Sequence, residues 1–459
     1  MIGAVALGAM GLLLMQPSKP RVIVIGLTNT RQTIEGIGAT ATGTWIPAVR
    51  ELYAKPEFAK AVGGDLGVSI IRLALPPAVQ ANEDLDVATL DFAKFDLAAF
   101  EPPAGFIRQI HTGHPELKVM LTVWSPPAWM KDNNSTTKGG HLRADRREHF
   151  AKLCAAACLG FEKTYGVPVH GLSIQNEPLF VQTYDSCIYT PAEMVETAKA
   201  VRAAFTKWDV KTKLMAPEDM ADGARLTGYL DAFSKDSEAL GGLDIVNVHG
   251  EPREVSGGIA GPWMSLHDRA ALLGKPLWMT ETSGEDPSWL GSKEHPRGGL
   301  ALAASIHHAL VDGECAAWVY WAITDPQADE FALMALDAPT PKYAALKQFA
   351  KFIRPGAVRL QVPSPDSKIL VSAFLEQERK ALTVVLINQG TSDAEVPIEL
   401  SAVPVGHIFE FEGARSSLTE MCVAIPKAIH DGRGPFKVAL PGQSVTTLSG
   451  TMKPAAPTR

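Results

Sequence analysis

The sequence predicts an α/β protein built on a closed (β/α)8 TIM barrel, with an attached antiparallel β-sandwich as a side domain. Three observations lead to this prediction. Short apolar runs rich in β-branched residues recur eight times, at intervals of roughly 30 to 55 residues. Helical patterns separate these runs, as strand–helix units of a parallel sheet require. Near Ile353 the helical periodicity stops, and alternating strand patterns continue almost to the end of the 459-residue chain.

The eight expected barrel strands are almost continuously apolar, which is typical of parallel strands buried on both faces. Eight such units favour a closed barrel over an open, doubly wound sheet. In chain order the expected strands are QTIEGIGA (32–39), VSIIRLAL (68–75), KVMLTVWS (118–125), GLSIQNE (171–177), KLMAPE (213–218), DIVNVHG (244–250), PLWMTE (276–281) and AAWVYWA (316–322).

Helices are expected between these strands, with clear examples at 148–166, 191–208 and 298–313. The first of them carries Cys154 and Cys158 four residues apart, on one helical face. No second Cys/His pair follows at zinc spacing, so packing is the better interpretation of these two residues. Five cysteines, an odd number in a long chain, do not suggest a disulfide framework.

The side domain is expected to be discontinuous in sequence. After Pro355-Gly356 the strand-like segments KILVSAFL, ALTVVLIN, EVPIEL, HIFEFEG and SVTTLSG follow one another, separated by turn residues. The segment RVIVIGL (21–27) reads as a further strand of this sheet. We therefore expect a barrel over 30–354 and a β-sandwich formed by 21–29 together with 355–450.

The N-terminal segment 1–20 resembles the core of a signal peptide. Its apolar run, from about Ala4 to Met15, is too short to span a bilayer, and no other stretch is a candidate membrane span. We therefore expect a secreted or periplasmic protein, although the usual positive start and cleavage site are missing. The formal net charge of −7 and the absence of Lys/Arg runs argue against a nucleic-acid partner. We expect the protein to act as a monomer.

Polar and aromatic side chains end the expected strands, where barrel enzymes place their catalytic groups. Carboxylates are the groups that cleave glycosidic bonds, and flat aromatic rings stack on sugar faces. This composition predicts an active site for a polysaccharide or oligosaccharide. The strand-end residues are Arg72, Trp124, Asn176 with Glu177, Glu218, His249, Glu281 and Trp321.

Glu177 and Glu281 are the expected catalytic pair. Each ends its own apolar strand, in SIQNEP and LWMTETS. A single strand-end Glu is more commonly a loop salt bridge or a helix cap, but two of them in an eight-strand pattern favour catalysis. A separation of about 5–5.5 Å would indicate retention of anomeric configuration, and about 6.5–9.5 Å inversion. Glu218 and Asp219 end the fifth strand and are weaker candidates, and Glu285 is expected to be solvated or at the rim.

Several aromatic residues have two open interpretations. Trp124, Trp129 and Trp321 are expected to include sugar platforms, although barrel packing is the alternative. Tyr184 and Tyr189 follow the fourth strand, where substrate contact and loop packing are both open. His249 is expected to shape the pocket, the alternative being a satisfied core histidine.

No metal or cofactor is expected. His111 and His114 fall in a turn between a helix and a strand, on the rim opposite the expected site. EGIGAT lacks the third glycine and the following helix of a dinucleotide site.

The sequence resembles glycoside hydrolase family 30. LTVWSPPAWMKDNN (121–134) is similar to the family's third-strand signature, SIQNEP (173–178) to its fourth-strand motif and WMTE (278–281) to its nucleophile strand. QTIEGIGAT, KFIRPGAVRL and SVTTL are similar to the family's edges. The resemblance implies that Glu177 is the acid/base and Glu281 the nucleophile. It also implies that Asn176 binds the sugar 2-hydroxyl and that Arg72 supports Glu281.

Within the family, GGHL (139–142) and TYDSCIYTPAEM (183–194) look most like the bacterial xylanase branch, so xylan is the expected substrate. The chain departs from the glucuronoxylan-specific members. TSGEDPSW and AITDPQADEF lack the tyrosines and the arginine that those members carry after the seventh and eighth strands. The acidic residues Asp286, Asp325, Asp329 and Glu330 would repel a glucuronate. The sixth strand ends in HGE (249–251), whereas many relatives have a tyrosine two residues after the histidine.

The alternatives are a β-1,6-glucanase or β-1,6-galactanase, an exo-acting β-glycosidase of the glucosylceramidase type, and a non-catalytic carbohydrate-binding relative. Loss of either carboxylate would indicate the last of these, and both are present. The segment between the third and fourth strands could carry a loop that closes one end of the cleft, as exo action requires.

Overall fold

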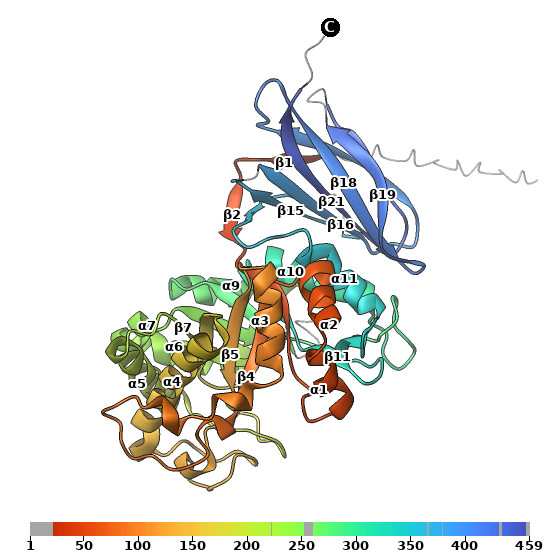
Figure 1. Cartoon of the computed structure of the whole chain (residues 1–459). Coiled ribbons are helices and arrows are strands. Elements are labelled where there is room, and N and C mark those ends of the chain that lie inside the picture. Colours follow the sequence, from red (N-terminus) through yellow and green to blue (C-terminus); the bar gives the residue numbers. More distant parts are fainter. Residues whose placement is uncertain are drawn as a thin grey trace, which may run out of the picture.

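In this computed structural model, the structure describes residues 22–221, 223–251, 260–364, 367–378, 380–430 and 434–455. The signal-like segment 1–20 lies outside the described residues. Eight parallel strands close into a barrel, and further strands form a separate side domain above it (Figure 1). No helix of the described ranges is long and apolar enough to cross a membrane.

The barrel strands confirm the eight expected segments. Each strand pairs in parallel with the next, and the last closes on the first through pairs such as Tyr320 with Ala39. The strands are β3 (Gly36–Thr40), β4 (Ile70–Leu75), β5 (Lys118–Val123), β6 (Val169–Ser173), β7 (Lys213–Met220), β8 (Ile245–His249), β9 (Leu277–Glu281) and β10 (Ala317–Tyr320).

Helices follow the strands in the order that the sequence predicts. Thr190 caps α5 through a reciprocal capping box with Glu193, and Pro191 occupies the first turn. Gly166 ends α4 in the left-handed conformation (φ 70°). The α-helices are α1 (Pro47–Tyr53), α2 (Pro56–Lys60), α3 (Pro103–Gly113), α4 (Arg147–Tyr165), α5 (Pro191–Lys207), α6 (Gly223–Lys235), α7 (Ser237–Gly242), α9 (Ala260–Leu272), α10 (Gly299–Val311) and α11 (Pro341–Ala350).

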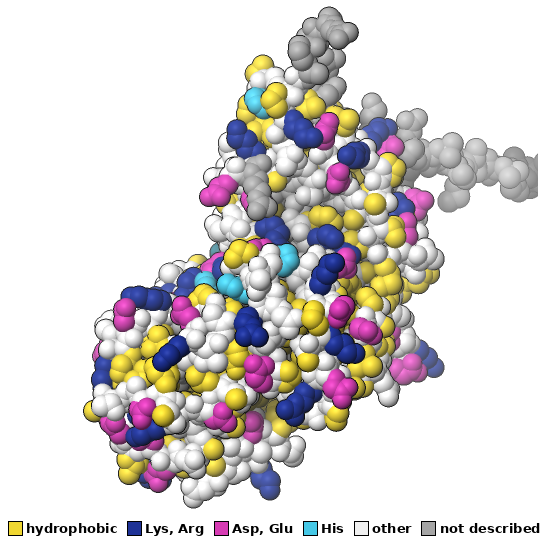
Figure 2. Space-filling view, in the orientation of Figure 1, with side chains coloured by type: hydrophobic (Ala, Val, Ile, Leu, Met, Phe, Trp, Pro, Cys, Tyr) yellow, Lys and Arg dark blue, Asp and Glu magenta, His cyan; other side chains and the backbone are white. Residues whose placement is uncertain are grey.

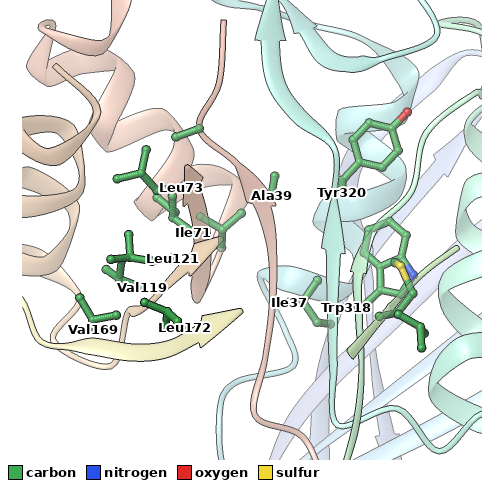
Figure 3. Close-up of a cluster of buried hydrophobic side chains, with 14 of the residues drawn as sticks. Ile37, Ala39, Ile71, Leu73, Val119, Leu121, Val169, Leu172, Trp318 and Tyr320 are labelled. Carbon is green, nitrogen blue, oxygen red and sulfur yellow. The ribbon is translucent and has the colours of Figure 1, made fainter. Parts of the chain in front are cut away.

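Alternation along the barrel strands divides the core into two layers. Side chains such as Ile71, Leu121 and Trp318 point outward into the layer between strands and helices (Figure 3). Inward-facing residues form a separate buried cluster, which includes Ile70, Met120, Met215, Ile245, Trp278 and Val319. The inner cluster fills the barrel, so only its carboxyl end remains available for a binding site.

The side domain contains two sheets. One is three-stranded, with the order β1-β17-β20, and the other is seven-stranded, with the order β19-β18-β21-β16-β15-β14-β2. The strands are β1 (Ile23–Gly26), β2 (Thr30–Thr33), β14 (Val358–Leu360), β15 (Ile369–Glu376), β16 (Ala381–Asn388), β17 (Ala394–Ser401), β18 (His407–Ser417), β19 (Glu420–His430), β20 (Phe436–Leu440) and β21 (Ser444–Pro454).

The N-terminal strand β1 pairs in parallel with β17 of this domain. The structure adds β2, whose pairing with β14 places residues 30–33 in the side-domain sheet rather than in the barrel wall. Three short strands, β11 (Ala322–Asp325), β12 (Ala332–Ala335) and β13 (Ala338–Pro339), form a small sheet after the last barrel strand. On the face that Figure 2 shows, acidic and basic side chains are interspersed.

Candidate active site

The carboxyl ends of five barrel strands bring six polar side chains together. Arg72 comes from β4, Asn176 and Glu177 from the segment after β6, Glu218 from β7, His249 from β8 and Glu281 from β9. All six are buried or nearly so. The sequence named five of these residues as site residues and gave Glu218 only a minor role.

Arg72 is the centre of this network and is completely buried. Its Nη1 donates a hydrogen bond to Glu281 Oε2 at 2.6 Å, and its Nη2 donates to Asn176 Oδ1 at 2.6 Å. Its Nε donates to Glu218 Oε1 at 3.0 Å. Arg72 therefore orients the side chains of Glu281 and Asn176 directly.

His249 provides a second buried cation. Its Nδ1 lies 3.1 Å from Glu177 Oε1, and its Nε2 lies 3.6 Å from Glu218 Oε1 and 3.7 Å from Glu281 Oε2. Burial by itself lowers the pKa of His249, but these carboxylates outweigh it and raise that pKa well above its ordinary value. These carboxyl groups therefore favour the protonated imidazole, which can donate to Glu177.

Glu177 and Glu281 face each other closely. One side-chain oxygen of each, together with a ring nitrogen of His249, forms a group of atoms within 4.8 Å of one another. Glu177 has a left-handed backbone (φ 44°), as does Glu218 (φ 56°). The Glu177 N–H donates to the Glu218 carbonyl at 3.0 Å, which fixes both bends. Strained backbone of this kind is concentrated at functional sites, where it aims a side chain.

The ionisation of Glu281 reflects opposing influences. Burial raises the pKa of Glu281 to about 7, while His249 and Arg72 lower it and the charges of Glu177 and Glu251 raise it. Burial thus outweighs the two cations, and Glu281 titrates near neutrality. A carboxylate that ionises near neutral pH in a nearly dry site is only weakly solvated, which favours attack on carbon.

Trp124 and Trp321 form an aromatic wall beside this network. Their ring centroids lie 6.0 Å apart, and the guanidinium carbon of Arg72 lies 4.4 Å from the Trp124 ring centroid. Both indoles are half-exposed. The pair therefore offers flat apolar surface beside Arg72, the residue that bonds Glu281 and Asn176.

The structure does not bring every predicted aromatic residue to the centre. Trp129 donates from its indole N–H to the Gln80 carbonyl and packs edge-on against His149. Tyr189 is buried beneath the loop after β6, and its carbonyl accepts a hydrogen bond from Tyr229. Tyr184 is 53% exposed. Burial raises the pKa of Tyr184, and the charges of Glu177 and Glu281 add to this effect.

The Glu177, His249 and Glu281 donors are close enough together to bind a metal ion. The Arg72 guanidinium already bonds Glu281 Oε2 at 2.6 Å, however, and its positive charge would repel a metal cation held by the same carboxylate. The chemistry of the donor set therefore fits acid–base work between two carboxyl groups better than metal binding.

Sequence reasoning missed several supporting residues. Glu218 is completely buried and contacts both cations, so its role is to hold Arg72 and His249 in place. Thr122 accepts a hydrogen bond from Arg72 Nε at 3.2 Å. Its signal in the sequence is a polar residue inside the apolar strand KVMLTV. Glu285, expected to be solvated or at the rim, is instead fully buried and bonded to Arg297 at 2.6 Å.

No family model matches the chain, but similar proteins and solved structures were found. Glucuronoxylanase XynC of Bacillus subtilis is 23% identical over 433 residues, which cover 92% of this chain and 90% of that protein. The crystal structure of a GH30 endoxylanase from Clostridium papyrosolvens C71 has a TM-score of 0.73 and 25% identity, covering 94% of this chain and all of that chain (100%).

A third similar structure is that of the endo-β1,6-glucanase BT3312. Its TM-score is 0.72 at 19% identity, covering 94% of each chain. At this identity the likeness concerns the fold alone. The fold is thus shared by enzymes that are named for different linkages, and the choice of substrate has to be argued from the site.

Proposed function

We propose that this chain, whose relatives support its place in the xylanase-like branch of glycoside hydrolase family 30, is a retaining endo-β-glycanase that hydrolyses xylan. The observation that carries the proposal is the short distance between two carboxyl groups. Side-chain oxygens of Glu177 and Glu281 lie within 4.8 Å of each other, at the open end of the barrel. Retaining enzymes need about 5–5.5 Å between these groups, whereas inverting enzymes need about 6.5–9.5 Å to admit a water molecule.

In the first step, ionised Glu281 attacks the anomeric carbon while protonated Glu177 donates its proton to the departing glycosidic oxygen. A covalent glycosyl-enzyme forms, and the sugar on the leaving side is released. In the second step Glu177, now a carboxylate, removes a proton from water, and the resulting oxygen displaces Glu281. Two inversions at the same carbon retain its configuration.

Arg72 and His249 hold the two carboxyl groups in position. Arg72 Nη1 donates to Glu281 at 2.6 Å, and His249 Nδ1 lies 3.1 Å from Glu177 Oε1. Asn176 is held by Arg72 with its amide free to reach a sugar hydroxyl. Trp124 and Trp321 supply the surface on which the sugar ring stacks.

The substrate that we propose is a xylan chain without a required glucuronate. This choice follows the named xylanase relatives, of which one is a glucuronoxylanase. Acidic residues in the loops after β9 and β10, among them Asp325, Asp329 and Glu330, support independence from an acidic substituent.

The test is product release from xylan, glucuronoxylan, β-1,6-glucan, β-1,6-galactan and aryl β-glycosides, with Glu177→Gln as the control. We expect oligosaccharides from plain xylan with the wild-type chain and none with the variant. Activity that is confined to a β-1,6-linked polymer or to aryl glycosides would keep the catalytic pair and overturn xylan as the substrate.

We also propose that the protein is exported and acts as a monomer. The apolar run near residues 4–15 supports export, and the complete set of catalytic groups within one chain supports monomeric action. Fractionation of the native host and light scattering of the purified protein test these two points separately.

A further inference from the structure

Glu251 is a further acidic side chain near the catalytic pair, and it has no role in the proposed mechanism. Glu251 lies two residues beyond His249, directly after β8, on the same rim of the barrel. Burial raises the pKa of Glu251, and the negative charge of Glu177 adds to this; Glu251 in turn adds to the raised pKa of Glu281. Glu251 is therefore within electrostatic reach of both catalytic carboxyl groups.

The two carboxyl oxygens of Glu251 differ in their hydrogen bonding. Oε1 accepts a hydrogen bond from Ser283 Oγ at 3.2 Å. Oε2 is buried and has no hydrogen-bond partner within the part of the chain that the structure describes. A buried polar oxygen without a partner is unfavourable, so a ligand hydroxyl that bonded it would supply the missing hydrogen bond.

The segment that carries Glu251 is hydrogen-bonded to the segment that carries Glu281. Ser283 follows Glu281 by two residues, and the Gly250 N–H donates to the Glu281 carbonyl at 2.6 Å. A side chain at position 250 would collide with Thr282, because an added Cβ would lie 2.8 Å from the Thr282 Cβ. The segment that carries Glu251 is thus held against the segment that carries Glu281, so the two carboxyl groups keep a fixed relation.

We propose that Glu251 is a substrate-binding residue whose free carboxyl oxygen hydrogen-bonds one hydroxyl group of the sugar held at the catalytic pair. This inference rests on the proposed function, and it adds a specificity determinant to that site. It predicts that one particular hydroxyl contributes to transition-state binding through Glu251, whereas the other hydroxyls do not.

The experiment combines substitutions in the protein with the removal of single hydroxyl groups from the substrate, as in a double-mutant cycle. Values of kcat/KM are measured for the wild-type chain, Glu251→Gln and Glu251→Ala on an aryl β-xylobioside and on analogues that lack one hydroxyl at a time. Glu294→Gln is the matched control, because Glu294 is an exposed carboxylate in the loop after the same nucleophile strand. Circular dichroism and thermal melting confirm that each variant is folded.

We expect Glu251→Ala to lower kcat/KM about tenfold on the parent substrate, with a smaller loss for Glu251→Gln and none for Glu294→Gln. On one deoxy analogue the wild-type chain and Glu251→Ala should become equal, since the contact is then already absent. Losses of the same size on every analogue would show a merely structural role and overturn the inference. If the wild-type chain itself leaves all xylosides intact, the proposed function fails and this inference fails with it.

Discussion

The charges of the site are balanced among side chains that are almost completely removed from solvent. Arg72 and His249 carry two positive charges, and Glu177, Glu218 and Glu281 are the carboxyl groups in direct contact with them. If one carboxyl group keeps a proton, two negative charges remain and the cluster is neutral. Buried charges need such pairing, so this cluster favours the state in which an acid and an ionised nucleophile are present together.

The proposed roles of Glu177 and Glu281 lead to different products when azide replaces a lost carboxylate. Glu281→Ala should abolish turnover on xylan, and azide should then attack an activated aryl glycoside once, which gives an inverted glycosyl azide. In Glu177→Ala the nucleophile remains, so azide should give a product of retained configuration. Proton NMR of the anomeric signals distinguishes the two azides. Normal turnover by Glu281→Ala would contradict the assignment.

The pKa of Glu281 predicts the acid side of the pH profile. Burial raises this pKa to about 7, and only the ionised form attacks, so kcat/KM should fall as the pH drops through about 7. His249 lowers the same pKa, so His249→Asn should raise it and move the acid limb upward by about one to two pH units. His141→Asn, which changes a histidine outside the site, is the control. An acid limb that stays in place or moves downward in His249→Asn would be inconsistent with this electrostatic role.

At the scale of single residues, the sequence predicted the residues that end apolar strands, because strand ends meet on one rim of a barrel. Arg72, Glu177 and Glu281 are examples. It did not predict the contacts of Glu218, because the bend that turns this side chain inward depends on a hydrogen bond from a different strand. Nor did it separate Trp129 from Trp124, since half-exposed aromatic residues of one loop differ only in the direction of their side chains.

At the scale of secondary-structure elements, the barrel strands were predictable because their apolar runs reflect burial on both faces. The edge strand β19 was not, since most of its side chains are exposed and it contains Pro426. Proline is tolerated at sheet edges, where its missing N–H costs no ladder bond, so an edge strand carries a weaker pattern. The short strand β14 was missed for another reason: three residues do not establish an alternation.

The loops after β9 and β10 are joined by a buried ionic network. Arg297 bonds the fully buried Glu285 at 2.6 Å, and the Tyr320 hydroxyl lies 3.4 Å from the same carboxyl group. Lys342 donates to Tyr320 and to the Asp329 carbonyl. This network holds in place two loops of the catalytic rim.

Removal of one charge from this network should be costly. Arg297→Met leaves Glu285 buried without its cation, and we expect the free energy of unfolding to fall by about 3–5 kcal/mol. Adding Glu285→Gln should recover most of that loss, because the uncompensated charge is then gone. Urea denaturation measures both variants, with the exposed Arg50→Met as the control. Equal stability of Arg297→Met and Arg50→Met would show that the ion pair has no structural role.

At the scale of the whole molecule, the barrel and the side domain share a continuous core. Leu370, Phe374, Val385 and Ile387 of β15 and β16 belong to the same buried cluster as the outer barrel layer. α11 lies between the two units and contacts β18, β19 and β21 (Figure 1). The discontinuous domain could be predicted from strand patterns at both ends of the chain, but this fusion of cores could not, because periodicity does not identify which layer an apolar side chain joins.

Gln348 of α11 tests whether the two units unfold together. Gln348 is completely buried. Its side-chain amide donates to Ser416 Oγ at 2.8 Å, and its backbone carbonyl accepts a hydrogen bond from the Thr447 hydroxyl. Gln348→Leu removes the amide and leaves Ser416 without this donor, so we expect a loss of about 1–3 kcal/mol. Because the core is continuous, calorimetry should show one transition that shifts as a whole, while the exposed Gln377→Leu leaves it unchanged. Two separate transitions, of which only one responds to Gln348→Leu, would mean that the side domain is an independent unit and that the barrel folds without it.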